Sequence, residues 1–134
     1  MLLTKECDYG IRIIRTLADG FKKTVEAICE AEHIPSKYAY KITKKLEHAG
    51  LLKSLRGRDG GYLLVKPLDE ITLYDIIAAV DSKMFVFECL RDDISCPLNT
   101  KDEPCGVHKE FSIIQDILIN SLTKNTLQDV FKNV

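Results

Sequence analysis

Residues 36–64 read SKYAYKITKKLEHAGLLKSLRGRDGGYLL, and this stretch decides the fold because it predicts a basic helix followed by a β-hairpin. Its apolar side chains at helical spacing are Ile42, Leu46 and Ala49. That spacing places one apolar stripe of a helix against a core. Ser36 is a favourable N-cap and Gly50 a favourable left-handed stop, so we expect the helix to span residues 36–49.

The hairpin prediction rests on a glycine-rich, turn-forming segment between two apolar runs. We expect one strand at residues 51–55, a turn at residues 56–60 and the returning strand at residues 61–65. The turn is cationic, so the hairpin would carry positive charge to its tip.

Two shorter helices precede the basic helix. Thr4 can cap the first, which we expect to end near Gly20 with Tyr9, Ile13, Ile14 and Leu17 buried. Thr24 can cap the second, at residues 25–32, and the residue before Pro35 is pushed toward an extended conformation that makes the turn. Helix, turn and basic helix form a helix-turn-helix, and the hairpin makes it winged. We therefore predict a mainly α fold with a small β-hairpin wing, a fold that binds DNA or serves as a protein-interaction module.

Charge separates the two halves of the chain. Residues 36–66 carry six lysines and two arginines against one glutamate and one aspartate, a net charge of +6. Residues 1–66 as a whole carry +5, and residues 67–134 carry −6. A cationic helix and a cationic loop suit the phosphates and grooves of a duplex. The same charges could also form an ordinary solvated face.

An irregular segment with three cysteines follows a helix that Thr72 can cap. The cysteines are Cys89, Cys96 and Cys105, with His108 close behind. In a cytosolic chain such a group favours metal or redox chemistry over a disulfide framework, whereas Cys7 and Cys29 fit small buried residues. An iron–sulfur cluster, zinc, reversible thiol oxidation and ordinary cysteines all stay open, because the spacing lacks the close pairs of a zinc ribbon.

The last helix carries more apolar side chains than one packed partner can cover. We expect it from His108 to about Leu122, and its large apolar residues are Phe111, Ile113, Ile114, Ile117, Leu118, Ile119 and Leu122. A second subunit is the natural cover, although a monomer that buries the whole helix would satisfy the same pattern. We expect the tail after this helix to fold back on the dimer.

These features divide the chain into three segments. They are a winged helix-turn-helix domain at residues 1–82, a cysteine-bearing loop at residues 83–107, and a dimerisation helix with a C-terminal tail at residues 108–134. No apolar run approaches the roughly 18 residues of a membrane span, and the N-terminus lacks a secretory signal, so we expect a cytoplasmic protein without a membrane partner. The phosphate loop, nucleophile elbow and HExxH motif are absent, so we do not expect an enzyme.

Three stretches resemble the Rrf-two family of bacterial winged-helix transcription regulators, in particular its iron–sulfur cluster-binding members. They are LTKECDYGIRIIRTLA at residues 3–18, GLLKSLRGRDGGYLLVKPLDEITLYDIIAAVD at residues 50–81, and CGVHKEFSIIQDILINSLTKNTLQDV at residues 105–130. The most specific piece is RGRDGGY at residues 56–62. The resemblance implies a homodimer on a palindromic operator of double-stranded DNA, with the basic helix in the major groove and the wing in the minor groove.

The resemblance also indicates which residues meet the DNA. The matching positions are Ser36, Tyr38, Tyr40 and Lys41 on the helix and Arg56, Gly57 and Arg58 on the wing, to which we add Lys37 and Lys44 for their charge. Arginine favours the narrow, negative minor groove, whereas lysines on a helix mainly add affinity without sequence choice.

The resemblance further implies that Cys89, Cys96 and Cys105 hold an iron–sulfur cluster, either 2Fe-2S or 4Fe-4S. The fourth ligand would be His108 of the same chain or Asp8 of the other subunit. His108 could instead simply begin the last helix, and Asp8 could simply pair with a neighbouring arginine.

The predicted function is a dimeric DNA-binding transcription regulator, such as a repressor, whose operator binding responds through the cluster to iron, redox state or nitric oxide. One alternative is a winged-helix regulator that senses thiols or small molecules without a cluster. Another is an interaction module in which Cys89, Cys96, Cys105 and His108 close a four-ligand zinc site.

Overall fold

The structure, a computed structural model, describes residues 3–132. In chain order its elements are α1 (Lys5–Thr16), α2 (Val25–Glu32), α3 (Ser36–His48), β1 (Leu52–Leu55), β2 (Gly61–Leu64), the 3-10 helix η1 (Leu68–Glu70), α4 (Leu73–Val80), the 3-10 helix η2 (Glu88–Leu90), α5 (Gly106–Thr123) and α6 (Leu127–Lys132). The predicted fold class, mainly α with a β-hairpin wing, is confirmed. The ends of the predicted segments, residues 1–2 and 133–134, lie outside the described residues.

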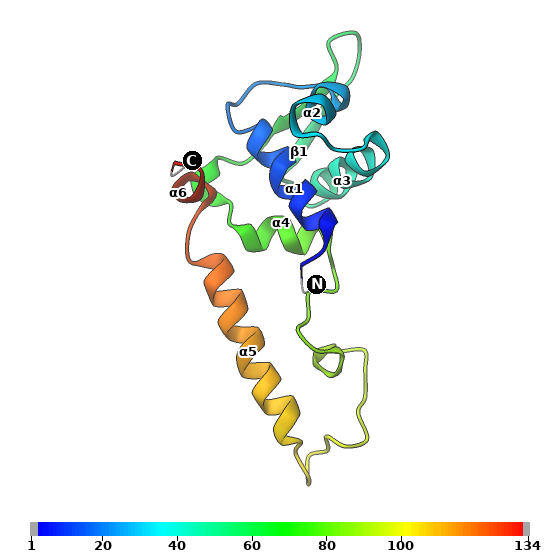
Figure 1. Ribbon diagram of the computed structural model, residues 1–134, viewed down its shortest axis with the longest axis vertical. Coiled ribbons are helices and arrows are strands. Elements are labelled where there is room, and N and C mark those ends of the chain that lie inside the picture. The colour runs from blue at the N-terminus through cyan, green and yellow to red at the C-terminus, as the bar shows by residue number, and fades with distance from the viewer. Residues whose placement is uncertain (1–2, 133–134) are drawn as a thin grey trace.

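The molecule has a winged domain, residues 3–80, and an arm, residues 81–126. In Figure 1, α1 to α4 and the hairpin gather at one end, while α5 runs away from them with the cysteine loop beside it. α6 then returns to the winged domain (Figure 1). Within residues 3–132 no helix combines the length and hydropathy that crossing a bilayer requires.

One core fills the winged domain. Its fully buried isoleucine and leucine side chains are Ile13, Ile14, Leu17, Ile28, Ile42, Leu46, Ile71, Ile76 and Leu127. The predicted stripe of α1 is therefore confirmed, with Tyr9 also buried. α1 approaches α4 closely at Gly10, where a Cβ would lie 2.9 Å from Cγ2 of Val80. A larger residue at position 10 would push the two helices apart.

The wing is tied at its base to the segment before α2. β1 and β2 pair antiparallel from Leu52 opposite Leu64 to Leu55 opposite Gly61. The N–H of Lys23 donates to the carbonyl oxygen of Tyr62 at 3.0 Å, and the N–H of Tyr62 donates back at 2.8 Å. Gly61 has a φ of +150°, and a Cβ there would lie 2.5 Å from the Lys23 carbonyl oxygen. Glycine at position 61 therefore allows the backbone approach that fixes the wing.

Several predicted boundaries of α1 and α3 are wrong. α1 ends at Thr16, well before Gly20, and the Thr4 side chain at its N-cap position makes no capping hydrogen bond. Pro35 is the N-cap of α3 and Ser36 is the first helical residue, because proline already holds the backbone in the required extended conformation. Ala49 is exposed, since it lies past the last helical turn as the C-cap. The predicted left-handed Gly50 is confirmed by its φ of +78°.

In the second half of the chain, the predicted helices are found in the structure with small shifts of their ends. Thr72 caps α4 in a reciprocal capping box with Asp75. α5 begins at Gly106, two residues before the predicted start at His108. The tail after α5 is predicted to fold back on the dimer; in the single chain it lies on its own winged domain. There Leu127 is fully buried, and its N–H donates to the carbonyl oxygen of Ile71 at 2.7 Å.

Candidate DNA interface and cysteine loop

α3 has one buried and one exposed face. Ala39, Ile42 and Leu46 are fully buried, and the buried Thr43 hydroxyl donates to the carbonyl oxygen of Ala39 at 2.8 Å. The predicted contact residues Ser36, Lys37, Tyr38, Tyr40, Lys41 and Lys44 are all exposed. The helix can therefore present these side chains to a groove while its other face stays in the core.

Two of these residues, Tyr38 and Tyr40, contact side chains of neighbouring helices. The Tyr38 ring lies 5.7 Å from the ring of Tyr9, and the Tyr40 hydroxyl donates to the carboxylate of Glu26. This hydrogen bond raises the pKa of Tyr40 and lowers the pKa of Glu26. α1 and α2 thus fix the direction of both tyrosines.

Glu6 of α1 ties down two lysines of α3. Its Oε1 lies 2.7 Å from Nζ of Lys41, and its Oε2 lies 3.0 Å from Nζ of Lys45. Nζ of Lys45 also donates to the carbonyl oxygen of Val80 at 2.8 Å. Hydrogen bonds from Lys41 and then Lys45 lower the pKa of Glu6, so this carboxylate stays charged. Its negative charge partly neutralises the positive charge of α3, the predicted recognition helix.

The wing tip carries exposed cations. Arg56, Gly57 and Arg58 are all exposed, and Gly57 has a φ of +105°, which the turn requires and glycine tolerates. Neither arginine takes part in an ion pair with any residue in the described range 3–132. Both guanidinium groups are therefore available to phosphates or to a minor groove.

The cysteine loop brings part of the predicted metal site together. Sγ of Cys89 lies 3.4 Å from Nδ1 of His108. Cys89, Cys96 and His108 line one open pocket of about 460 Å³, together with residues 90–95 and 99. Cys105 does not line this pocket; it is the N-cap of α5, and its N–H donates to Oδ1 of Asn99 at 2.9 Å.

The four predicted local ligands are not assembled into a closed site. In the range 3–132 no three Cys, His, Asp or Glu side chains have a geometry that could hold a metal ion. All five cysteines are free thiols. The donor set of thiols and one imidazole nevertheless fits a soft metal or an iron–sulfur centre, and three of its members already share one pocket.

Asp8 lies on the winged domain and contacts α1 itself. Its Oδ1 accepts from Nε of Arg12 at 3.0 Å, and its Oδ2 lies 2.9 Å from the same guanidinium. This hydrogen bond raises the pKa of Arg12. Asp8 also lines an apolar pocket with Leu3, Cys7 and Ile11 rather than the pocket of the loop cysteines.

A residue that the sequence reasoning missed holds the loop against α5. Gln115 is only 8% exposed; its Oε1 accepts from the N–H of Val86 at 2.8 Å, and its Nε2 donates to the carbonyl oxygen of Met84 at 3.0 Å. Beside it, the rings of Phe87 and Phe111 stack with centroids 4.4 Å apart. The available signal was weak, because the last helix carries two amides, Gln115 and Asn120, within its apolar pattern, and a buried amide needs partners for its polar atoms.

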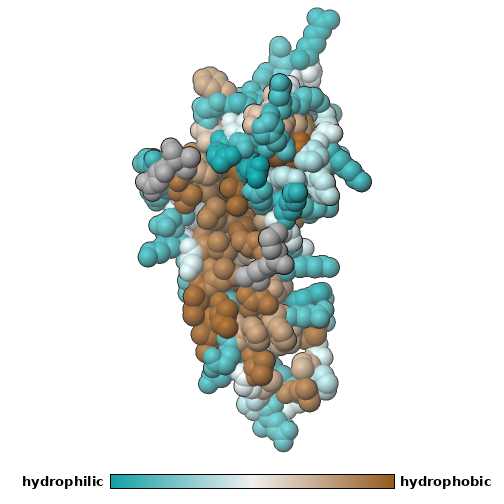
Figure 2. All heavy atoms as spheres, viewed as in Figure 1, coloured by the Kyte–Doolittle hydropathy of each residue, from teal (hydrophilic) through white to brown (hydrophobic). Residues whose placement is uncertain are grey.

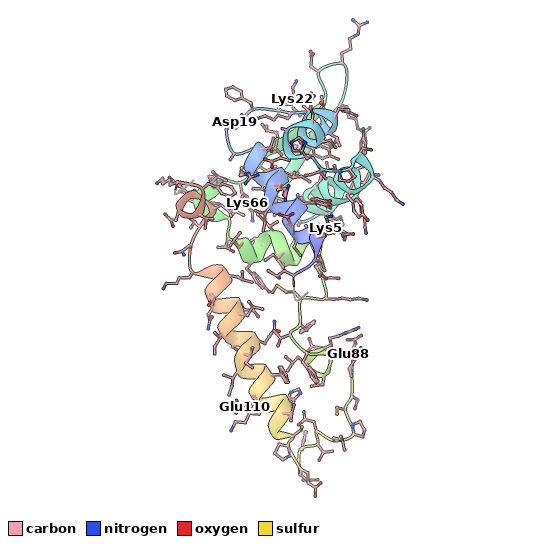
Figure 3. All side chains as sticks on the ribbon, in the orientation of Figure 1. Lys5, Asp19, Lys22, Lys66, Glu88 and Glu110 are labelled. Carbon is pink, nitrogen blue, oxygen red and sulfur yellow. The ribbon has the colours of Figure 1, made fainter. Side chains whose placement is uncertain are left out.

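The opposite side of α5 is apolar and open to solvent. Val107, Ile113, Ile114 and Ile117 are exposed, with Ile117 at 59%. Figure 2 shows hydrophobic residues running down the middle of the molecule, from the winged domain along the arm. In Figure 3 the labelled Glu88 and Glu110 lie on the arm, and the labelled Lys5, Asp19, Lys22 and Lys66 lie on the winged domain. A patch of this kind marks an interaction surface.

Known proteins match this chain over nearly its whole length. The model of the Rrf2 family, which is the Rrf-two family above and is described as an iron-dependent transcriptional regulator, matches residues 3–133. The protein aau3 of Rhizobium meliloti (strain 1021) is 30% identical over 98% of this chain and 86% of its own length.

Solved structures show the same fold. CymR (YrzC), the global cysteine regulator of B. subtilis, matches with a TM-score of 0.77 and 25% identity over 98% of this chain and 97% of its own. IscR of T. potens matches with a TM-score of 0.72 and 24% identity over 98% of this chain and 86% of its own.

Proposed function

This chain belongs to the Rrf2 family of transcriptional regulators, and from that premise we propose that it binds an operator as a symmetric dimer under the control of its cysteine loop. Regulators of this kind act in the cytoplasm and are not enzymes. The observation that carries the DNA-binding part is the wing tip, where Arg56 and Arg58 are exposed and have no ion-pair partner in residues 3–132.

The recognition helix supports the same proposal. Lys37 and Lys44 add charge on the exposed face of α3, and the two tyrosines are held ready by α1 and α2. We assign the lysines and Ser36 mainly to phosphate contacts, the tyrosines to base edges, and Arg56 to the minor groove.

The apolar side of α5 supports a dimer. Exposed Ile113, Ile114 and Ile117 would face the same residues of a second copy around a two-fold axis, as isologous interfaces require. Such a dimer presents two recognition helices to the two halves of a palindromic operator. Affinity then depends on how well the spacing of the two winged domains matches the operator.

The cysteine loop is the proposed control element. Cys89, Cys96 and Cys105 would hold an iron–sulfur cluster, with His108 or Asp8 of the partner subunit as the fourth ligand. When bound, the cluster would supply reversible electron transfer and reactivity toward oxygen or nitric oxide. The chain's own contribution is the open pocket that Cys89, Cys96 and His108 line, in which Sγ of Cys89 lies against Nδ1 of His108 on α5.

A cluster-free thiol sensor is the second candidate. It is favoured by the free thiols and by the contact between Sγ of Cys89 and Nδ1 of His108. The structural likeness to CymR, a cysteine regulator, is compatible with it. A closed zinc site would use the same four local residues and would have no redox role.

Spectroscopy of protein purified without air separates these candidates. A cluster gives a visible absorption band with iron and sulfide in the metal analysis, zinc gives a colourless metalloprotein, and a thiol sensor gives neither. The cluster proposal also requires that operator affinity differ between the loaded protein and the same protein after the metal is removed. Equal affinity of the two forms would refute cluster control.

The DNA-binding part is tested separately by anisotropy on a mixed-sequence duplex over a range of salt concentrations. Lys44→Ala and Arg56→Ala should each weaken binding and lower the salt slope by about 1, the contribution of one phosphate contact. Lys109→Ala removes the same charge as Lys44→Ala but from the exposed surface of the arm, so it should leave both quantities unchanged. Unchanged binding in all three variants would refute the proposed interface.

A further inference from the structure

We propose that Gln115 is a positioning residue that couples the Cys89 and His108 end of the cysteine loop to the winged domain. The inference rests on the proposed function, because it names the joint through which the loop would change DNA binding. It assigns to one amide side chain a role that needs both of its polar atoms.

The position of Gln115 in α5 is the first observation. Among the residues of α5 it alone is buried, and it is a polar residue on a helix whose isoleucines are partly exposed. Its amide reaches two backbone groups of the loop, accepting from Val86 and donating to the carbonyl oxygen of Met84. No buried side-chain nitrogen or oxygen in residues 3–132 lacks a partner, so the amide is fully satisfied.

The second observation is a continuous line of contacts along α5. The helix residues that meet the loop or the winged domain are His108, Phe111, Gln115, Ile119 and Leu122, three or four positions apart and so on one face. His108 contacts Cys89, Phe111 stacks on Phe87, and Gln115 bonds to Val86 and Met84. Along α5 the loop residues are therefore met in reverse chain order. The loop from residue 84 to residue 89 therefore runs antiparallel to α5 and is held at three successive points.

The third observation is where this line ends. The Met84 side chain is buried with Cys7 of α1 and Ile77 of α4, and Ile119 and Leu122 pack against the same cluster. Met84 thus has its backbone held by Gln115 and its side chain held by the winged domain. A shift of the loop along α5 must either move Met84 within this cluster or break the hydrogen bonds of Gln115.

Hydrogen bonding makes this joint bistable rather than continuously deformable. If the loop slides along α5 while it still covers Gln115, the buried amide loses both partners, and an unpaired buried polar group costs more than an ordinary hydrogen bond contributes. The loop is therefore held in one register or released, and release removes the link that Met84 makes between the loop and the winged domain, while Ile119 and Leu122 of α5 stay packed on that domain. Gln115 thus converts a change at Cys89 into a change in the spacing of the DNA-reading units.

Two substitutions separate this role from simple packing. Gln115→Met keeps the length and approximate volume of the side chain but removes both hydrogen bonds. Gln115→Glu keeps the acceptor for Val86, and only its protonated form can also donate to the carbonyl oxygen of Met84. Asp116→Asn, at the adjacent exposed position of α5, is the matched control.

Amide hydrogen exchange of the metal-free protein gives the first readout. We expect the protection factor at Val86 to fall by roughly tenfold in Gln115→Met, as for the loss of one ordinary hydrogen bond. In Gln115→Glu, which keeps the acceptor for the Val86 N–H, protection should fall less than in Gln115→Met and should rise as the pH is lowered through the titration of the introduced carboxyl, which restores the donor to Met84. Asp116→Asn should match the wild type. Protection at Val86 that is unchanged in Gln115→Met, with the winged domain still folded, would overturn the proposal.

A double-mutant cycle with Cys89→Ser gives the second readout. In the Gln115 background Cys89→Ser should alter exchange at Cys7 and Ile77, and in the Gln115→Met background this effect should disappear. Additive effects of the two substitutions would overturn the coupling. If the exchange data show coupling but no form of the protein binds DNA, the proposed function is wrong, whereas the coupling through Gln115 is still supported.

Discussion

In the winged domain, α1, α3 and α4 share a core of fully buried isoleucines and leucines, whereas in the arm α5 buries Gln115 alone and leaves Ile113, Ile114 and Ile117 exposed. The winged domain therefore carries its own hydrophobic stabilisation within one chain. The arm is held by a few specific contacts to its loop and exposes an apolar side. This difference supports the proposal that the state of the arm depends on a second subunit or a bound group.

Charge is also divided, but at an earlier point in the chain. Residues 1–66 carry a net charge of +5 and residues 67–134 a net charge of −6, so α4 of the winged domain falls in the negative half. A region that must meet DNA and a region that must not are thus kept apart along the chain. The predictions below test how independent the two regions are.

The largest expected effect comes from the core of the winged domain. Ile42→Ala removes a fully buried side chain and should lower the free energy of unfolding by about 3 kcal/mol. Ile114→Ala makes the same chemical change on the exposed side of α5 and should cost under about 1 kcal/mol in the monomer. Denaturant unfolding at concentrations where subunits are separate checks both, and equal losses would remove the distinction between the two regions.

The next largest effect concerns association of the arm. Ile117→Asn should weaken the dimer by about thirtyfold, because burial of the exposed part of this isoleucine is worth roughly 1 kcal/mol at each copy and so about 2 kcal/mol in all. Sedimentation equilibrium measures the dissociation constant. Asp116→Asn, at an exposed position of α5 away from the apolar side, serves as the control. A wild-type protein that stays monomeric, or a dimer insensitive to Ile117→Asn, would contradict the assignment of this surface.

Glu6→Gln tests how far the winged domain limits its own affinity for DNA. The substitution frees Lys41 and Lys45 from a negative charge, so the salt slope of duplex binding should steepen by about 1 and binding at low salt should tighten. Asp93→Asn, which disrupts the Arg91 ion pair of the arm, makes the same change in net charge and should have no such effect. Weaker binding in Glu6→Gln would show that the two lysines need Glu6 to hold them in place.

The same glutamate makes a pH dependence testable. Its pKa is lowered by Lys41 and Lys45, so its contribution to stability is present above the ordinary pKa of glutamate, roughly 4.3, and is lost as the pH falls through the lowered value. The stability difference between the wild type and Glu6→Gln should therefore shrink in acid. Thermal unfolding of both proteins across this range measures it, and a difference independent of pH would argue that Glu6 acts through packing.

The smallest expected effect distinguishes the two candidates for the fourth ligand. Asp8→Asn removes an exposed ion pair to Arg12 and should change the free energy of unfolding by less than about 0.5 kcal/mol. If Asp8 ligates across the dimer, the variant should still lose the visible absorption of the anaerobic protein. If His108 is the ligand, His108→Ala should lose it and Asp8→Asn should retain it.

The sequence predicts much of the winged domain because its signals are local. The apolar spacing of Ile13 and Leu17, the capping threonine at position 72 and the left-handed Gly50 all act within one element, and the structure bears them out. The wrong boundaries lie where a neighbour decides the outcome, as at Ser36, which Pro35 displaces from the cap. The bridge between Lys23 and Tyr62 was not predicted, since it joins segments far apart in the chain.

The cysteine loop, in contrast, could be predicted only in part. Its cysteines could be recognised as a group from composition and spacing, but their placement could not, because an irregular segment has no period to read. That Cys89 meets His108 while Cys105 caps α5 is decided by contacts across the arm. Which contacts DNA makes with the predicted residues of α3 and the wing stays a prediction.

By itself, the sequence determined the winged helix-turn-helix, the separation of charge and the apolar excess of the last helix, because periodicity, caps and turn residues are properties of neighbouring positions. The tertiary structure alone decided that Gln115 fastens the loop, that Glu6 holds two lysines of α3, and that Leu127 returns to the core of the winged domain. Each of these pairs residues more than thirty positions apart or across elements, where satisfaction of buried polar atoms and packing of the assembled helices select the partner.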